Sequence, residues 1–344
     1  MTIFIKDDLR ASVEAATGGL CTVFYTEKNQ PTFMRMIPKF NLQDIDASLG
    51  TGVHPAFVVN GQEVDAIHVG MYQGIRKNGE LLSLPGVLPS VSAPYTTFLN
   101  EARSCGAGFG LTTNAMYAAI SLWIAKHGTE PRGNTNWGRS HLMTYETGVR
   151  PDSGAPGAAT GDGKTLTGSG PLSWRHDGSV AGIADYVGNC WEFSPGMRIV
   201  DGEIQVIADN NAITLGDFGD SAPWRAILQD GTLVNPGTAN TLKYSSNNGV
   251  EIITGIDSTK ASVSKVFSTV AAASGVTIPA IMKALMLAPS LLSSGTLYVN
   301  DDGQRYPLRL GRFHDAGGAG PGALSLYNPA SAASSTICAR PAKV

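Results

Sequence analysis

Three side chains with hard oxygen donors stand close together in the stretch ADYVGNCWEF, which spans residues 184–193. They are Asp185, Asn189 and Glu192. Carboxylate and amide oxygens are the ligands that Ca²⁺ prefers, so these residues are the calcium candidates of the chain. The same side chains can instead accept hydrogen bonds from backbone amides of loops that lack a strand partner. The residue types favour this second interpretation and leave metal binding unassigned.

No arrangement typical of a hydrolase is present. The chain has six histidines and many serines, but it contains no G-x-S-x-G motif and no pair of histidines at metal-binding spacing. We expect His54, His141 and His176 to be hydrogen-bonded structural residues. The sequence therefore predicts no catalytic residue.

The four cysteines, Cys21, Cys105, Cys190 and Cys338, are far apart in the sequence and form no C-x-x-C motif. A zinc site has no support, and a disulfide framework is not expected in a chain of this size. We expect all four to be structural thiols.

Composition limits the classes of partner. The 344 residues are 42% hydrophobic and 15% charged, with a net charge of −3 and no basic block, which favours a globular protein and disfavours nucleic acid as a ligand. No run of eighteen apolar residues indicates a membrane span. The first residues, MTIFIKDDLRASVEAA, do not resemble a signal peptide. We expect a cytosolic protein that leaves the cell by assembly into a particle.

The elements that must position these residues predict an α+β protein. A small N-terminal segment, residues 1–50, contains a short helix and two strands, at 22–28 and 31–38. Residues 55–61 and 65–73 suggest two strands separated by a turn at Asn60 and Gly61. Two helices follow, near 94–107 and at 113–127; the second has Thr113 as its N-cap and Gly128 just past its end.

The remainder is rich in loops. Residues 129–173 are glycine-rich and polar, and long loops of this kind often carry function. Residues 194–300 alternate strand-like runs with two helical patterns, at 261–274 and 278–292. The chain closes with strands near 295–301 and 305–311 and a final segment poor in charge.

The segment GSGPLSWRHDGSVAGIADYVGNCWEF, residues 168–193, resembles the hallmark of the formylglycine-generating-enzyme branch of the C-type lectin fold. The matching positions are Gly182, Ile183, Asp185, Gly188, Asn189, Trp191 and Glu192, with PRGN at 131–134 upstream. The resemblance implies a C-type lectin fold over residues 51–344, built from short antiparallel strands, two or more helices and long irregular loops, with an insertion at about 195–300. It also implies structural roles for Asp185, Gly188, Asn189, Trp191 and Glu192, and family members often hold calcium nearby.

The C-terminal segment, residues 309–341, resembles the variable region of proteins diversified by retroelements, in which a reverse transcriptase miscopies template adenines. The fixed positions of that frame are Arg309, Gly311, Phe313, Gly317, Gly320, Ala323, Leu324, Leu326, Asn328, Ser331, Ile337, Arg340 and Pro341. Leu324, Leu326 and Ile337 are expected to be buried anchors.

The resemblance implies a ligand-binding face made of exchangeable side chains on loops that a scaffold holds. We assign to it Arg312, Phe313, His314, Asp315, Gly318, Ser325, Tyr327, Asn328, Ala330, Ala332, Ser334, Ser335 and Thr336. Phe313, His314 and Tyr327 are the side chains most able to act as hot spots.

These resemblances imply a non-enzymatic binding protein, similar to a phage tail adhesin, that recognises a protein or glycan receptor on a bacterial surface. A homo-oligomer would gain avidity from weak single sites. The alternative is an oxidase of the formylglycine-generating type, which acts on a protein cysteine; that branch uses a C-terminal cysteine pair, whereas this chain has Cys338 alone there. A calcium-dependent sugar lectin is disfavoured because the E-P-N and Q-P-D signatures are absent.

Overall fold

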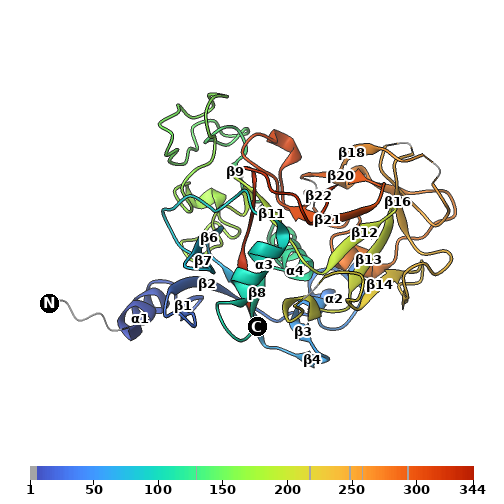
Figure 1. Cartoon of the computed structure of the whole chain (residues 1–344), viewed down its shortest axis with the longest axis horizontal. Coiled ribbons are helices and arrows are strands. Elements are labelled where there is room, and N and C mark those ends of the chain that lie inside the picture. The colour runs from blue at the N-terminus through green and yellow to red at the C-terminus, as the bar shows by residue number, and fades with distance from the viewer. Residues whose placement is uncertain (1–5, 129, 217, 248, 258, 293) are drawn as a thin grey trace.

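The computed structural model describes residues 6–344 except for residues 129, 217, 248, 258 and 293. Residues 1–5, part of the segment in which we expect no signal peptide, lie outside this description. The described chain is a mixed α+β protein, as predicted (Figure 1). Its α-helices are α1 (Lys6–Ala16), α2 (Leu42–Ile45), α3 (Tyr95–Arg103), α4 (Asn114–His127) and α5 (Ala280–Ala284). Short 3₁₀ turns lie at Ala47–Leu49, Pro55–Phe57, Leu172–Trp174, Asn211–Ile213, Phe267–Thr269 and Ala316–Gly318.

The two helices predicted after residue 90 are both confirmed. In α4 the Thr113 hydroxyl accepts a hydrogen bond from the Met116 amide at 3.2 Å, and Gly128 ends the helix in the left-handed conformation with φ 74°. Ten residues of α4 are buried, so the helix is enclosed on most of its surface and lies near the centre of the molecule (Figure 1). Pro94 is the N-cap of α3, which buries Phe98 and Leu99.

A five-stranded antiparallel sheet contains both the start and the end of the chain. Its order is β1 (Cys21–Tyr25), β2 (Pro31–Pro38), β5 (Ala66–Gly70), β24 (Pro341–Lys343) and β8 (Phe109–Leu111). The strands expected at 22–28 and 31–38 are β1 and β2. Because β2 pairs with β5, this sheet crosses the expected boundary at residue 50.

A larger, curled sheet makes up the other half of the molecule. Its main path is β18 (Ser262–Val266), β20 (Thr296–Asn300), β22 (Leu324–Asn328), β21 (Gln304–Arg309), β12 (Met197–Val200), β13 (Glu203–Ile207), β16 (Lys243–Ser245), β17 (Glu251–Ile253) and β19 (Ala271–Ala272). Four strands branch from it: β11 (Trp191–Phe193), β23 (Ile337–Ala339), β14 (Trp224–Ile227) and β15 (Leu233–Val234). Residues 195–300, expected as an insertion, thus share one sheet with β21 and β22.

Two details of the strand prediction need correction. The strands are not all antiparallel, since β20 with β22, β11 with β23, β17 with β19, and β9 (Gly133–Asn134) with β10 (Val187–Gly188) pair in parallel. The turn at Asn60 and Gly61 joins only β3 (Val58–Val59) to β4 (Gln62–Glu63). A further hairpin joins β6 (Gly74–Lys77) to β7 (Glu80–Ser83).

Neither helical pattern of residues 261–292 forms an α-helix of the expected length. Residues 261–274 contain β18 and β19 and no α-helix, because pairing of β18 with β20 overrides a weak local preference. Residues 278–292 form only the short α5, after which Met286 takes a positive φ of 52°. Met282, Leu285 and Met286 are nevertheless buried as expected, whereas Ile278 and Ile281 are half-buried.

The C-terminal segment is an integral part of the fold. Strand β22 lies inside the large sheet, β23 pairs with β11, and β24 lies inside the five-stranded sheet. The predicted anchors are confirmed, since Leu324 and Leu326 are fully buried and Ile337 is 3% exposed. The segment therefore joins the two sheets, and its backbone is fixed at both ends.

Among the described residues, no helix is long and apolar enough to cross a lipid bilayer.

Candidate functional site

A pocket of about 350 Å³ opens between β22 and the segment that precedes β23. It is lined by Trp191, Tyr298, Leu308, Arg312, Asp315, Ser325, Tyr327, Asn328, Ser334, Thr336 and Ile337. Seven of these are among the thirteen side chains that the sequence assigns to the ligand-binding face: Arg312, Asp315, Ser325, Tyr327, Asn328, Ser334 and Thr336. That they bind a ligand stays a prediction, but the fold brings more than half of the assigned set to one cavity.

Strand pairing builds the floor of the pocket. In β22, Leu324 and Leu326 point into the core, so Ser325 and Tyr327 point to the other side of the sheet. Register places Ser325 opposite Tyr298 of β20 and opposite Leu308 of β21. Three neighbouring strands thus contribute adjacent side chains to one surface.

Aromatic rings form one side of this surface. The Tyr298 ring packs edge-on against Trp191, with centroids 5.9 Å apart, and against Tyr327, with centroids 5.6 Å apart. The Tyr327 hydroxyl donates to the carbonyl of Val263 at 3.0 Å. Packed rings of this kind offer contact area at a low cost in conformational entropy.

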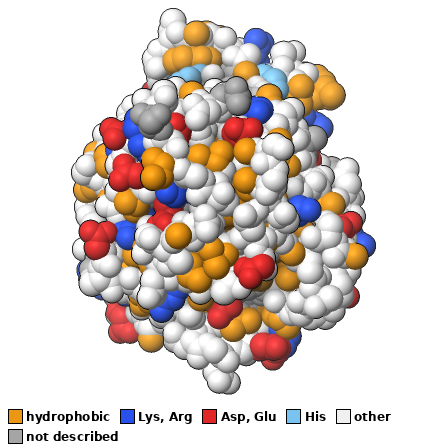
Figure 2. All heavy atoms as spheres, turned by 90° about the vertical axis from the view of Figure 1, so that its right-hand side faces the viewer, with side chains coloured by type: hydrophobic (Ala, Val, Ile, Leu, Met, Phe, Trp, Pro, Cys, Tyr) orange, Lys and Arg blue, Asp and Glu red, His pale blue; other side chains and the backbone are white. Residues whose placement is uncertain are grey.

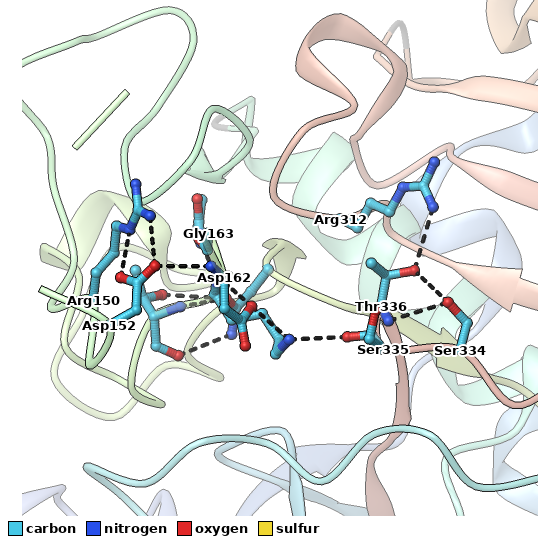
Figure 3. A network of polar contacts seen from close by, with 12 residues as sticks. Arg150, Asp152, Asp162, Gly163, Arg312, Ser334, Ser335 and Thr336 are labelled. Atoms are coloured by element: carbon cyan, nitrogen blue, oxygen red, sulfur yellow. Dashed lines mark hydrogen bonds and ion pairs between the residues drawn. The ribbon is translucent and has the colours of Figure 1, made fainter. Parts of the chain in front are cut away.

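Polar side chains form the opposite wall. The Arg312 Nε donates to Asp315 Oδ1 at 3.0 Å, and its Nη1 donates to the Thr336 hydroxyl at 3.3 Å. The Thr336 and Ser334 hydroxyls lie 3.0 Å apart (Figure 3). The Arg312 side chain is 35% exposed and that of Asp315 is 9% exposed, so an acid and a base both border the cavity.

A loop from the middle of the chain supports this wall from behind. Lys164 donates to the Ser335 carbonyl at 2.9 Å and to Asp162 at 2.6 Å, which joins residues 150–163 to residues 334–336 (Figure 3). Arg150 pairs with Asp152 and donates to four main-chain carbonyls of the surrounding loops. The loop lacks regular secondary structure, so hydrogen bonds from the buried Arg150 and Lys164 side chains take the place of strand pairing and hold its backbone.

The remaining assigned residues lie outside the pocket. Ala330 and Ala332 are half-buried against the core cluster around α3, Ser335 is exposed, and Gly318 lies against the Tyr298 hydroxyl. His314 is exposed and stacks on Trp137 at 5.7 Å. Partial burial and the charge of Arg312 lower the pKa of His314.

Phe313, which the sequence assigns to the ligand-binding face, is buried in the structure. Phe313 is 5% exposed and packs edge-on against Trp137, with centroids 4.9 Å apart. A Cβ added at Gly163 would lie 2.5 Å from this ring, so the loop approaches it closely. Phe313 therefore supports the face rather than presenting surface to a ligand.

Sequence reasoning missed two pocket residues, and it gave two others, Trp191 and the anchor Ile337, only structural roles although both line the pocket. Tyr298 and Leu308 carry no motif, and only the pairing of their strands with β22 places them in the pocket. The alternation of buried and half-buried side chains along residues 296–300 could have indicated that Tyr298 faces outward. It could not have identified β22 as the neighbouring strand.

Next to Trp191 in the chain, Glu192 forms a fully buried ion pair with Arg340. Arg340 Nη2 lies 2.7 Å from Glu192 Oε1, and its Nε lies 2.9 Å from Oε2. Tyr117 and Gln73 also donate to this carboxylate. Glu192 was expected to accept backbone amides; that detail is wrong, because its oxygens are occupied by side chains.

The neighbouring residues Asn189 and Asp185 accept hydrogen bonds from backbone amides of loops, which is the interpretation that the sequence favoured. Asn189 Oδ1 accepts from the Thr165 amide at 2.8 Å and from Asn134 at 3.0 Å. Asp185 Oδ2 accepts from the Gly168 amide at 2.7 Å, and burial raises the pKa of Asp185 to about 6. Within the described chain no group of three or more His, Cys, Asp or Glu could hold a metal ion. The three calcium candidates, Asp185, Asn189 and Glu192, each accept hydrogen bonds from protein groups, and metal binding stays unassigned.

The three histidines that we expected to be hydrogen-bonded are so, and the four cysteines are buried. His54 and His176 each accept a main-chain amide at Nδ1, and His141 bonds to the Thr135 hydroxyl at 2.8 Å. The four cysteines are buried and free. Cys338 lies against Cys190, and burial raises the pKa of its thiol.

No protein-family model matches this chain, and a search of curated proteins finds no match either.

Proposed function

We propose that this chain is a non-enzymatic binding protein with a C-type lectin fold of the formylglycine-generating-enzyme-like branch. Its C-terminal segment, residues 309–341, is a variable ligand-binding region diversified by a retroelement. Its role is that of a receptor-binding protein in a phage tail, and its receptor is a protein or glycan on a bacterial surface.

One observation carries the proposal. Seven of the thirteen side chains assigned from the sequence line a single pocket, and that pocket also contains an arginine–aspartate pair and packed aromatic rings. A solvated tail would not gather these side chains. Pockets with an apolar floor and a few convergent polar groups are typical of binding sites.

The separation of scaffold from surface supports diversification. In β22 the alternation assigns Leu324 and Leu326 to the core and Ser325 and Tyr327 to the pocket. Exchange of the pocket residues changes the surface while the buried residues keep the backbone in place. This division lets many sequences share one fold.

The oxidase alternative has weaker support. The observation that favours it is the contact between Cys338 and Cys190, which brings a second cysteine next to the single C-terminal one. Both thiols are fully buried, and a raised pKa keeps Cys338 protonated, whereas the thiolate is the reactive form. Turnover of a cysteine-containing peptide with copper would favour the oxidase.

Two experiments test the binding proposal. Sequencing the DNA around the gene should reveal, beside a reverse transcriptase, a near-copy of the 3′ end that differs only where the copy carries adenine. Differences at codons for Leu324 or Arg340 would contradict the assignment of scaffold and surface.

The second experiment measures binding of the purified chain to a panel of bacterial cells. The pocket variant Arg312→Ala/Tyr327→Ala should lose binding to the strain that binds the parent chain. Arg76→Ala is the matched control, since Arg76 is also 35% exposed and also pairs with one carboxylate, that of Glu101. Equal binding by the pocket variant and the control would refute the proposal.

A further inference from the structure

Residues outside the variable segment hold the main chain of residues 334–336, which we call the carbonyl strip. The three successive carbonyls of this strip each accept one hydrogen bond of 2.9 Å. The donors to residues 334, 335 and 336 are, in that order, the Ser92 amide, the Lys164 ammonium and the Trp191 amide. None of these bonds uses a side chain of the strip, so all three can persist when the side chains at 334–336 are exchanged.

Lys164 is the one donor of the three that acts through its side chain. Its Nζ lies 2.9 Å from the Ser335 carbonyl and 2.6 Å from Asp162 Oδ1 (Figure 3). Figure 2 shows lysine and arginine side chains at the surface of one face of the molecule, whereas Lys164 is only 4% exposed. A buried ammonium is unfavourable unless it is paired, so its partners fix its position.

The same ammonium reaches a second stretch of the variable segment. It lies 5.9 Å from the centre of the Phe313 ring, within the range of a cation–π contact. The main chain of Phe313 is held as well, because its amide donates to the Asn189 carbonyl at 3.1 Å and its carbonyl accepts from the Trp137 amide at 2.7 Å. Lys164 therefore contacts both stretches whose polar side chains meet in the pocket, 312–315 and 334–336.

The relative position of these two stretches decides which polar groups the pocket presents. Arg312 Nη1 donates to the Thr336 hydroxyl at 3.3 Å, and that hydroxyl lies 3.0 Å from the Ser334 hydroxyl. The bond from Arg312 is already longer than usual for an N–H···O contact, and such bonds weaken steeply as their geometry departs from the optimum. A small displacement of the carbonyl strip would therefore break this side of the pocket.

We propose that Lys164 is a positioning residue of the binding pocket. Its ammonium holds the Ser335 carbonyl close to the Phe313 ring, whatever side chain stands at position 335. The inference rests on the proposed function, and it assigns the geometry of the variable pocket to a loop outside the variable segment. A wall that is already ordered loses less conformational freedom on binding, and the gain in affinity is expected in slower dissociation.

The first test is hydrogen exchange of the full chain, which needs no ligand. Lys164→Met removes the ammonium and keeps much of the side-chain volume, and the Asp162 carboxylate, 44% exposed, stays solvated. The amides of residues 335–337 should exchange about tenfold faster, the factor expected when one charge-assisted hydrogen bond is lost. Ser335→Ala removes an exposed hydroxyl and keeps the carbonyl, so exchange should equal that of the parent chain.

The second test measures dissociation of the full chain from cells of the bacterial strain that it binds. Lys164→Met should dissociate about tenfold faster, with an unchanged association rate. A change that only lowered the folded fraction would reduce the amount bound and leave the dissociation rate unchanged. Lys343→Met is the matched control and should dissociate like the parent. Lys343 also donates to one carbonyl, that of Ala107 at 2.7 Å, and also lies over an aromatic ring, 4.8 Å from the centre of Phe109.

The outcomes separate this inference from the proposed function. Unchanged exchange at residues 335–337 in Lys164→Met would overturn the inference without reference to any receptor. Faster exchange with an unchanged dissociation rate would overturn it too, while loss of binding by Arg312→Ala/Tyr327→Ala would leave the proposed function standing. A parent chain that binds no strain would refute the proposed function instead, and exchange alone would then decide whether Lys164 holds the carbonyl strip.

A further variant separates the carbonyl contact from the ion pair. Asp162→Asn removes the charge next to Lys164 and keeps an acceptor oxygen, so the contact with the Ser335 carbonyl can persist. Its exchange and dissociation rates should lie close to those of the parent chain. Effects equal to those of Lys164→Met would mean that the ion pair holds the strip, and the inference would fail.

Discussion

Two arginines of the C-terminal segment provide a direct test of the division between scaffold and surface. Arg312 borders the pocket, its side chain is 35% exposed, and it pairs with Asp315. Arg340 is fully buried with Glu192 and also donates to three main-chain carbonyls. The perturbation is the same in both places, Arg312→Met and Arg340→Met, which removes the charge and keeps much of the side-chain volume.

The expected losses of unfolding free energy differ severalfold. Removal of one partner from a buried ion pair costs about 3–5 kcal/mol because the other charge stays buried without compensation. An exposed pair contributes about 0.2–1 kcal/mol. Arg340→Met should therefore remove a large share of a typical stability of about 5–15 kcal/mol, whereas Arg312→Met should cost about 1 kcal/mol or less.

Urea unfolding followed by tryptophan fluorescence measures both losses. In the double variant Glu192→Gln/Arg340→Met the buried charge is absent, so at least half of the loss caused by Arg340→Met should be recovered. Equal losses for the two arginine variants would refute the view that the pocket wall is independent of the scaffold. A cost below about 1 kcal/mol for Arg340→Met would refute the role of the buried pair.

Three further predictions follow from burial and close contacts. In urea unfolding experiments at a series of pH values, the free energy of unfolding should rise from about pH 4 to 6.5. Burial lowers the pKa of His54 and His176 to about 4, so within this window only the unfolded chain protonates these two imidazoles. His54→Gln should make the rise smaller. Gly163→Ala should increase proteolytic cleavage within residues 150–163, because the new Cβ would lie 2.5 Å from the Phe313 ring. Gly318→Ala is the control: its new Cβ would meet only the end of the Tyr298 side chain, so cleavage should stay unchanged. EDTA or added calcium should shift the melting temperature by less than about 1 °C, because Asn189 Oδ1, Asp185 Oδ2 and Glu192 Oε1 already accept hydrogen bonds. A calcium-dependent rise of several degrees would contradict this.

Local signals allowed part of the fold to be predicted. Helix α4 has its N-cap at Thr113 and its end at Gly128, and both signals act within one helical turn of the residues they affect. The anchors Leu324 and Leu326 follow from alternation along a single strand. Where a local preference was weak, as at 261–274, pairing with a distant strand decided the structure instead.

By itself, then, the sequence determined the mixed α+β class, the two helices after residue 90, and the burial of Leu324, Leu326 and Ile337. Only the tertiary structure decided that Tyr298 and Leu308 join Ser325 in one pocket, that the Phe313 ring is buried, and that Glu192 meets Arg340 across 148 residues of chain. The reason is physical: caps and alternation depend on neighbours a few residues away, whereas strand order, register and the pairing of buried charges depend on which distant segments the whole chain packs together.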